Sequence, residues 1–88
     1  MRMKMFMNKP KVKSKRIRAL IDRAVGSGEM TGLIVGSLEI TAEKFPAGKG
    51  HEVKIFVGGQ ARPISTITGN SVKATVKEVM SYLKTSPY

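Results

Sequence analysis

Lysine and arginine side chains are the residues of this sequence whose type and spacing indicate chemistry most clearly. Residues 1–18 contain eight of them and no aspartate or glutamate. Cations without neighbouring carboxylates attract polyanions, because each phosphate that they neutralise releases a condensed counterion. The basic residues of this stretch that we expect to bind a polyanion are Lys11, Lys13, Lys15, Arg16 and Arg18.

A second set of lysines lies on a predicted helix near the end of the sequence. Lys73, Lys77 and Lys84 follow one another at spacings of four and seven residues, so they share one face of that helix. Asn70 and Ser71 precede the helix, and a helix N-terminus with such residues favours a phosphate. The same pattern is also typical of an ordinary solvated helix face, and a basic tail is often only solvated. Both interpretations are open at this point.

The sequence offers little for catalysis. It has no cysteine and a single histidine, His51, which argues against thiol chemistry and against a histidine-rich metal site within one chain. The acidic residues are scattered along the chain, and neither a GxxxxGK[ST] phosphate-binding loop nor a nucleophile-elbow serine occurs. We therefore expect a protein that is not an enzyme and that needs no metal or other cofactor.

Length and charge limit the class of protein further. The 88 residues predict one domain with a modest core, and the formal net charge is +10. No apolar run approaches the ~20 residues that cross a membrane, and the start of the chain lacks the apolar stretch of a secretory signal. We expect a cytoplasmic protein with no membrane partner. Residues 1–13 would form a basic Met/Lys-rich arm, and residues 14–85 a single domain.

Two helices are predicted from the spacing of apolar residues. Residues 17–25 are apolar at i, i+3, i+4, i+7 and i+8, with Ser14 as a candidate N-cap and with Gly26 and Gly28 as the stop. Residues 72–83 carry a similar apolar stripe. The cations of both segments would lie on the faces turned away from the core.

Three antiparallel strands are predicted between these helices. Residues 32–44 alternate as one long strand in which Ile34 and Leu38 face the same side, and residues 53–57 and 64–68 form two more. The order helix, three strands, helix predicts an α+β fold (αβββα), with a three-stranded antiparallel sheet and both helices on one sheet face. A basic N-terminal arm or an extra strand would precede it.

Residues 48–83, GKGHEVKIFVGGQARPISTITGNSVKATVKEVMSYL, contain three short motifs in succession. These are a Gly-His loop, a strand that ends in Val-Gly-Gly, and a glycine that leads into a capped, lysine-bearing helix. In these motifs the chain resembles the double-stranded RNA-binding domain. In that family the histidine loop enters a minor groove, the first helix contacts another, and lysines at the start of the last helix hold the phosphates between them. The resemblance implies contacts from Lys49, His51, Asn70, Ser71, Lys73 and Lys77, and from Arg16 or Arg23 in the first helix.

The sequence therefore predicts a small nucleic-acid-binding protein. It would bind the phosphate backbone of duplex RNA or DNA with little sequence specificity, and only the resemblance favours RNA. An alternative from another class is a protein-binding regulator that dimerises, or docks on an acidic partner. Its contact would be an edge strand, at Pro63 because proline cannot donate to a ladder, or the strand-like Met-rich residues 1–7.

Overall fold

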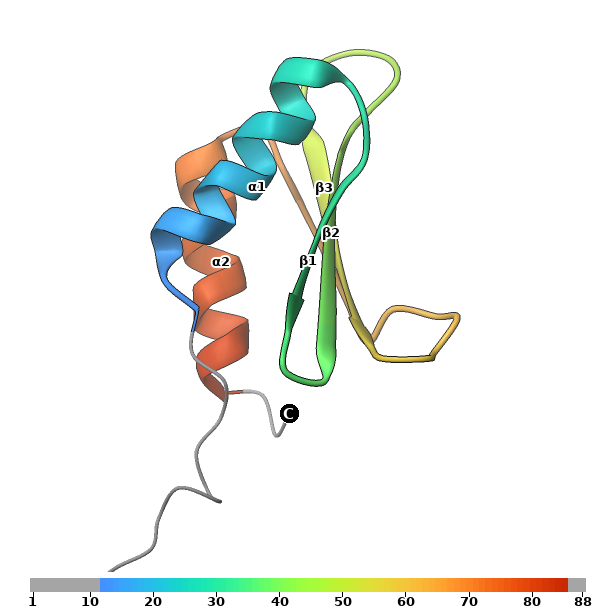
Figure 1. The fold of residues 1–88 in the computed structure, drawn as a ribbon. Helices are drawn as coiled ribbons and strands as arrows, with labels where there is room; N and C mark the ends of the chain where they lie inside the picture. Colours follow the sequence, from blue (N-terminus) through green and yellow to red (C-terminus); the bar gives the residue numbers. More distant parts are fainter. Residues whose placement is uncertain (1–11, 86–88) are drawn as a thin grey trace, which may run out of the picture.

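Six elements follow one another in the order α1–β1–β2–β3–β4–α2 in the computed structural model, which describes residues 12–85 (Figure 1). Most of the predicted arm, and with it the strand-like stretch at the start of the chain, lies outside the described residues. The elements are α1 Ser14–Ser27, β1 Thr31–Val35, β2 Leu38–Lys44, β3 His51–Val57, β4 Ser65–Gly69 and α2 Val72–Thr85.

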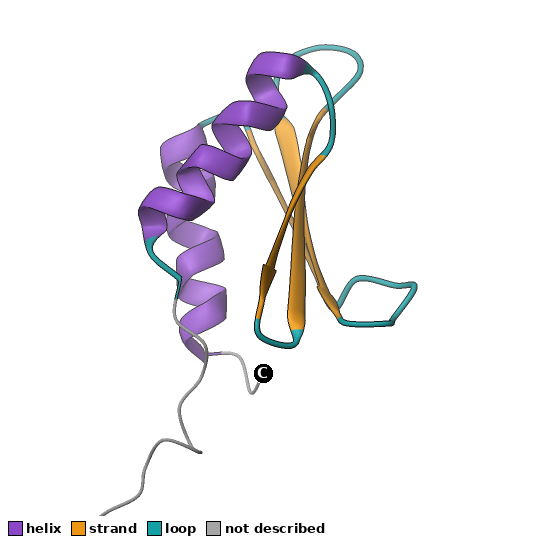
Figure 2. Ribbon diagram, viewed as in Figure 1, coloured by secondary structure: helices purple, strands orange, loops and turns teal. Residues whose placement is uncertain are grey.

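The four strands form one antiparallel sheet in the order β1-β2-β3-β4. Both helices cover the same face of this sheet and pack against each other, as Figure 2 shows, with α1 over β1 and β2 and α2 over β4. The predicted α+β class is confirmed, whereas the predicted number of strands is wrong. Neither described helix is long and apolar enough to cross a membrane.

The additional strand arises because the predicted long strand, residues 32–44, is a hairpin. Val35 pairs with Leu38, so Gly36 and Ser37 form a two-residue turn. Gly36 has a φ of 61°, which a type II′ turn requires of its first central residue and which glycine adopts without strain. The apolar alternation continues through this turn, so the period of the pattern does not reveal it.

The same turn changes which residues face the core. Val35 is buried together with Leu38, because residues that pair across two strands point to the same face. Ile34 lies on the open face of the sheet opposite Glu39, and its side chain is 74% exposed. The prediction that Ile34 and Leu38 face the same side is therefore wrong.

The core lies between the helix layer and the inner face of the sheet. Its helical members recur at the predicted spacings, which confirms both apolar stripes, and the strands contribute every second residue. The buried hydrophobic residues are Ile17, Leu20, Ile21, Ala24, Val35, Leu38, Ile40, Ala42, Val53, Ile55, Ile67, Val76 and Val79.

The helix ends agree in part with the predicted stop and cap residues. Gly28 ends α1 with a φ of 77°, and its amide donates a hydrogen bond to the Ala24 carbonyl. Lys13, not Ser14, occupies the N-cap position of α1, and no side chain caps that end. At the start of α2 the Ser71 hydroxyl accepts a hydrogen bond from the Ala74 amide at 3.3 Å.

Candidate functional site

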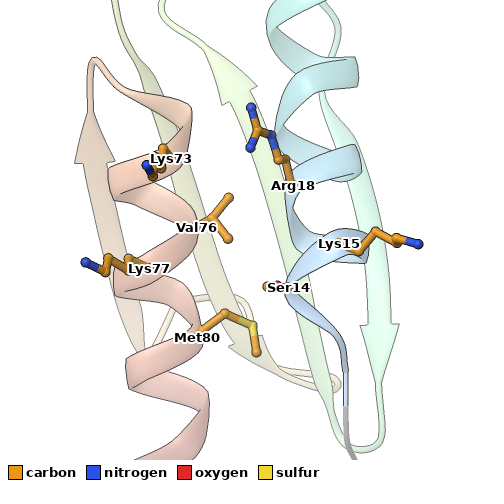
Figure 3. A pocket seen from close by; sticks show the side chains of 7 residues that line it. All are labelled: Ser14, Lys15, Arg18, Lys73, Val76, Lys77 and Met80. Carbon is orange, nitrogen blue, oxygen red and sulfur yellow. The ribbon is translucent and has the colours of Figure 1, made fainter.

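A groove lies between α1 and α2 on the side of the helix layer that faces away from the sheet (Figure 3). Its volume is about 440 Å³. The amphipathic pattern explains its position, because the two apolar stripes converge on the core and leave the polar flanks of the helices facing each other. The lining residues are Ser14, Lys15, Arg18, Lys73, Val76, Lys77 and Met80.

Four of these lining residues are cations and none is an acid. Figure 3 shows Arg18 between the two helices, whereas the ammonium groups of Lys15 and Lys77 point outward on opposite flanks. Val76 and Met80 point from α2 toward α1 and form an apolar floor. The groove and its two flanks therefore offer positive charge from both helices to an extended anion.

Most of this charge is available to a ligand. Arg18 Nε lies 3.6 Å from Asp22 Oδ2, but both side chains are more than half exposed, and such a surface pair contributes little stability. Within residues 12–85, the other groove cations, Lys15, Lys73 and Lys77, have no carboxylate at ion-pair distance. Three of the four cations around the groove are therefore not neutralised by an acidic side chain within the described residues.

The other basic residues predicted on α1 do not line the groove. Arg16 and Arg23 are exposed and lie on the same face of α1, because seven residues make about two helical turns. Arg18 follows Arg16 by two residues, about half a turn, and therefore lies on a different face, the one that lines the groove. Lys13 is exposed at the N-cap position, beside the first turn of α1. Lys11 lies outside the described residues.

Three further predicted residues, Lys49, Asn70 and Ser71, are exposed at the end of the molecule where α2 begins. The β2–β3 loop and the start of α2 touch there, since a Cβ placed on Gly50 would lie 2.8 Å from Asn70 Oδ1. None of the three lines the groove, so the structure separates them from the four groove cations.

His51 is not in a loop, so the prediction that it belongs to a Gly-His loop before the strand is wrong. It is the first residue of β3 and is 1% exposed, with its Nε2 2.6 Å from Thr75 Oγ1. Burial lowers the pKa of the His51 imidazole below its usual value, because desolvation disfavours the charged form. A buried ring in this position does not reach a nucleic-acid groove.

The residues around His51 form close packing contacts between α2 and the sheet. A Cβ on Gly69 would lie 2.8 Å from Thr75 Oγ1, and one on Gly50, whose φ is 115°, would lie 3.1 Å from the Gly69 carbonyl. Sequence analysis missed Thr75 as a buried residue, although Thr75 falls three residues after Val72 on the apolar stripe. The Gly-His motif therefore has a packing role in this fold.

Sequence analysis did not identify the apolar residues of the groove as part of a site. The helical period places Val76 and Met80 on the apolar stripe of residues 72–83, and both contact the core. Nothing in that period distinguishes a core position from one at the edge of the core that also lines a groove. Among residues 12–85, no three His, Asp or Glu side chains gather closely enough to hold a metal ion.

No protein-family model, curated protein or solved structure matches this chain.

Proposed function

We propose that this protein binds nucleic acid through the phosphate backbone, with the groove between α1 and α2 at the centre of the contact. The observation that supports this most strongly is the set of four groove cations, contributed by two helices and not accompanied by a lining acid. Phosphates are the anions that such a distributed set of charges fits, since each cation neutralises a separate phosphate.

The geometry of the helix pair suits an extended anion better than a single small one. Lys73 and Lys77 are one helical turn apart, which is about 6 Å along the axis. Packed helices are about 8–10 Å apart, so Lys15 and Arg18 on α1 face other phosphates than the lysines of α2 do. The exposed Arg16 and Lys13 extend the positive surface beyond the groove.

The contact offers little readout of base sequence. Three of the four groove cations are lysines, whose flexible stems present point charges and not the planar fork that recognises guanine. The preference for RNA that the resemblance to the double-stranded RNA-binding domain implied rested partly on a groove-entering histidine, and His51 is buried here. The proposal therefore covers duplex RNA and duplex DNA alike.

The experiment that tests the proposal is a fluorescence-anisotropy titration of the full chain against matched duplex RNA, duplex DNA and single strands over a series of salt concentrations. We expect binding to duplexes that weakens steeply as salt rises. Lys73→Gln combined with Lys77→Gln should reduce the slope of log K against log salt by about two, because each lost phosphate contact removes about one released counterion.

A matched pair of neutral substitutions outside the groove serves as the control. Lys44→Gln with Arg62→Gln removes the same two charges from exposed positions that do not line the groove. This variant should retain most of the wild-type slope. Absence of binding at low salt would contradict the proposal, and so would equal slopes for the two double variants.

A further inference from the structure

The outer edge of β1 is open in the described part of the chain. The strand order makes β1 and β4 the two edges of the sheet. Folded proteins usually protect an edge with a charge, a proline or a bulge, because its unpaired amides and carbonyls template another strand. The five residues of β1, TGLIV, contain neither charge nor proline, and all five pair with β2 in unbroken register. At the other edge, the exposed Arg62 and Pro63 precede β4.

The charge around β1 also differs from that of the rest of the chain. Residues 24–43 form the longest stretch without lysine or arginine in a chain of net charge +10, and they contain Glu29, Glu39 and Glu43. Two copies of so basic a protein repel each other wherever their cations face. The β1 strand itself brings no cation to such a contact, whereas α1, the helix that lies over β1, carries the exposed Arg16 and Arg23 beside it, so that the contact depends on salt.

Two large apolar side chains are exposed beside this edge. Ile34 is 74% exposed and Met30, just before the strand, is 64% exposed, and no other large hydrophobic residue described is exposed to this extent. Ile34 also borders a hollow of about 270 Å³ next to the β1–β2 turn, which Gly36 and Ser37 help to line. The open backbone edge and the exposed apolar side chains thus coincide at one place.

We propose that β1 pairs in antiparallel fashion with β1 of a second copy of this chain. A register centred on Leu33 pairs all five strand residues and sets Ile34 of each copy opposite Gly32 of the other. Continued beyond the strand, this register brings Met30 of one copy beside Gly36, next to the hollow of the other. The apolar side chains of each copy then cover apolar surface of its partner.

The resulting dimer has one continuous sheet of eight strands, twice the four of each copy. The two-fold axis is perpendicular to the sheet, so the helices of both copies lie on the same face. A five-residue strand pair is small beside the ~1,600 Å² of a standard interface, so the dimer is a reversible one that forms with rising concentration. If the proposed function is correct, the two groove surfaces face the same polyanion; the dimer itself does not rest on that function.

Salt distinguishes this inference from the proposed function. Screening weakens the repulsion between two chains of charge +10, so added salt strengthens the dimer. The same salt weakens binding to phosphates. Failure of one proposal therefore leaves the other testable on the same protein.

The test is analytical ultracentrifugation of the full chain over a wide concentration range at low and high salt, compared with two variants. Ile34→Lys places a charge on the apolar strip, and we expect it to weaken self-association at least about tenfold. Thr68→Lys adds the same charge to an exposed position on β4, at the other edge, and should leave self-association nearly unchanged.

Hydrogen exchange of the β1 amides provides the second readout. We expect their protection to rise with protein concentration and to fall in Ile34→Lys. A wild-type chain that is monomeric at every concentration would overturn the inference. If the protection of the β1 amides did not depend on concentration, this would also overturn the inference, because β1 pairs with β2 within one copy and only a second copy adds protection with rising concentration. Equal effects of the two lysine variants would contradict the assigned edge.

Discussion

The helix layer and the open face of the sheet are both in contact with solvent, yet they differ in charge. The two helices carry seven lysine and arginine residues and two acids, whereas the four strands carry two lysines and three glutamates. On the sheet, Glu52 pairs with Lys54 at 3.5 Å and lies opposite Glu43. On the helices, three of the four groove cations have no acidic partner among residues 12–85.

This difference shows that two amphipathic layers packed on one core can carry opposite charge on their outer faces. Both turn their regularly spaced apolar residues toward the core, which leaves the composition of their outer faces free to differ. A polyanion is attracted to the helix layer and repelled by Glu39 and Glu43 on the sheet. Under the proposed function, this charge distribution would orient the molecule with the groove toward the phosphates and leave β1 at the side.

Reversing charge in the groove should have the largest effect of the changes considered. Lys73→Glu with Lys77→Glu replaces two attractions by two repulsions, and we expect at least about hundredfold weaker binding to duplex nucleic acid at low salt. Anisotropy titration measures it. Lys44→Glu with Arg62→Glu makes the same change in net charge outside the groove. If this control loses as much affinity, net charge and not the groove determines binding.

A methyl group on Gly69 tests how firmly the two regions are joined. Its Cβ would lie 2.8 Å from the buried Thr75 Oγ1, so Gly69→Ala should destabilise the fold by about 1–3 kcal/mol. Gly26→Ala is the matched glycine control. It lies within α1 with no atom near its Cβ position, and alanine there should stabilise by about 0.5–1 kcal/mol. Urea denaturation measures both, and equal shifts would contradict the described packing at Gly69.

The pH dependence of the free energy of unfolding tests the buried contact between His51 and Thr75. The pKa of the buried His51 is lowered from its usual 6.5, so the unfolded chain takes up a proton at a higher pH than the folded chain does. The contribution of this group is therefore fully present above pH 6.5 and is lost as the pH falls through the folded pKa. Thermal unfolding between neutral and mildly acidic pH should show this decline, and His51→Gln should flatten it. An unchanged slope in that variant would assign the decline to other groups.

The smallest expected effect concerns the sheet. Glu43 and Glu52 are direct cross-strand partners of like charge, so Glu43→Gln should stabilise the fold by less than about 1 kcal/mol. Binding to nucleic acid should change little, because the substituted position faces away from the helix layer. If Glu43→Gln raised the affinity for nucleic acid by as much as the substitutions of Lys73 and Lys77 lower it, the contact would lie on the sheet and not in the groove.

The parts of the fold that could be predicted are those in which a period maps directly onto a face. The stripes of α1 and α2 were predicted correctly because their apolar residues recur at helical spacing. The Gly36-Ser37 turn was missed because it interrupts no alternation, although a Gly-X pair between apolar runs is itself a hairpin signal. Because this turn was missed, the predicted sheet had one strand too few, and Ile34 was predicted on the wrong face of the sheet.

The candidate site could be predicted only as a list of charges. Lys73 and Lys77 were placed on one face by their spacing, but their meeting with Arg18 depends on how two helices pack, which no local pattern records. His51 was misplaced for a related reason. Its burial depends on Gly69 and Thr75, residues that are distant in sequence and adjacent only in the fold.

The most direct test of the central claim is a ¹⁵N NMR titration of the full chain with duplex nucleic acid at low salt. We expect amide shift changes to concentrate at the groove residues, Lys15, Arg18, Lys73 and Lys77, and to be small at Glu39, Glu43 and Thr66 on the open sheet face. Changes centred on the sheet face, with the helices unaffected, would contradict the account.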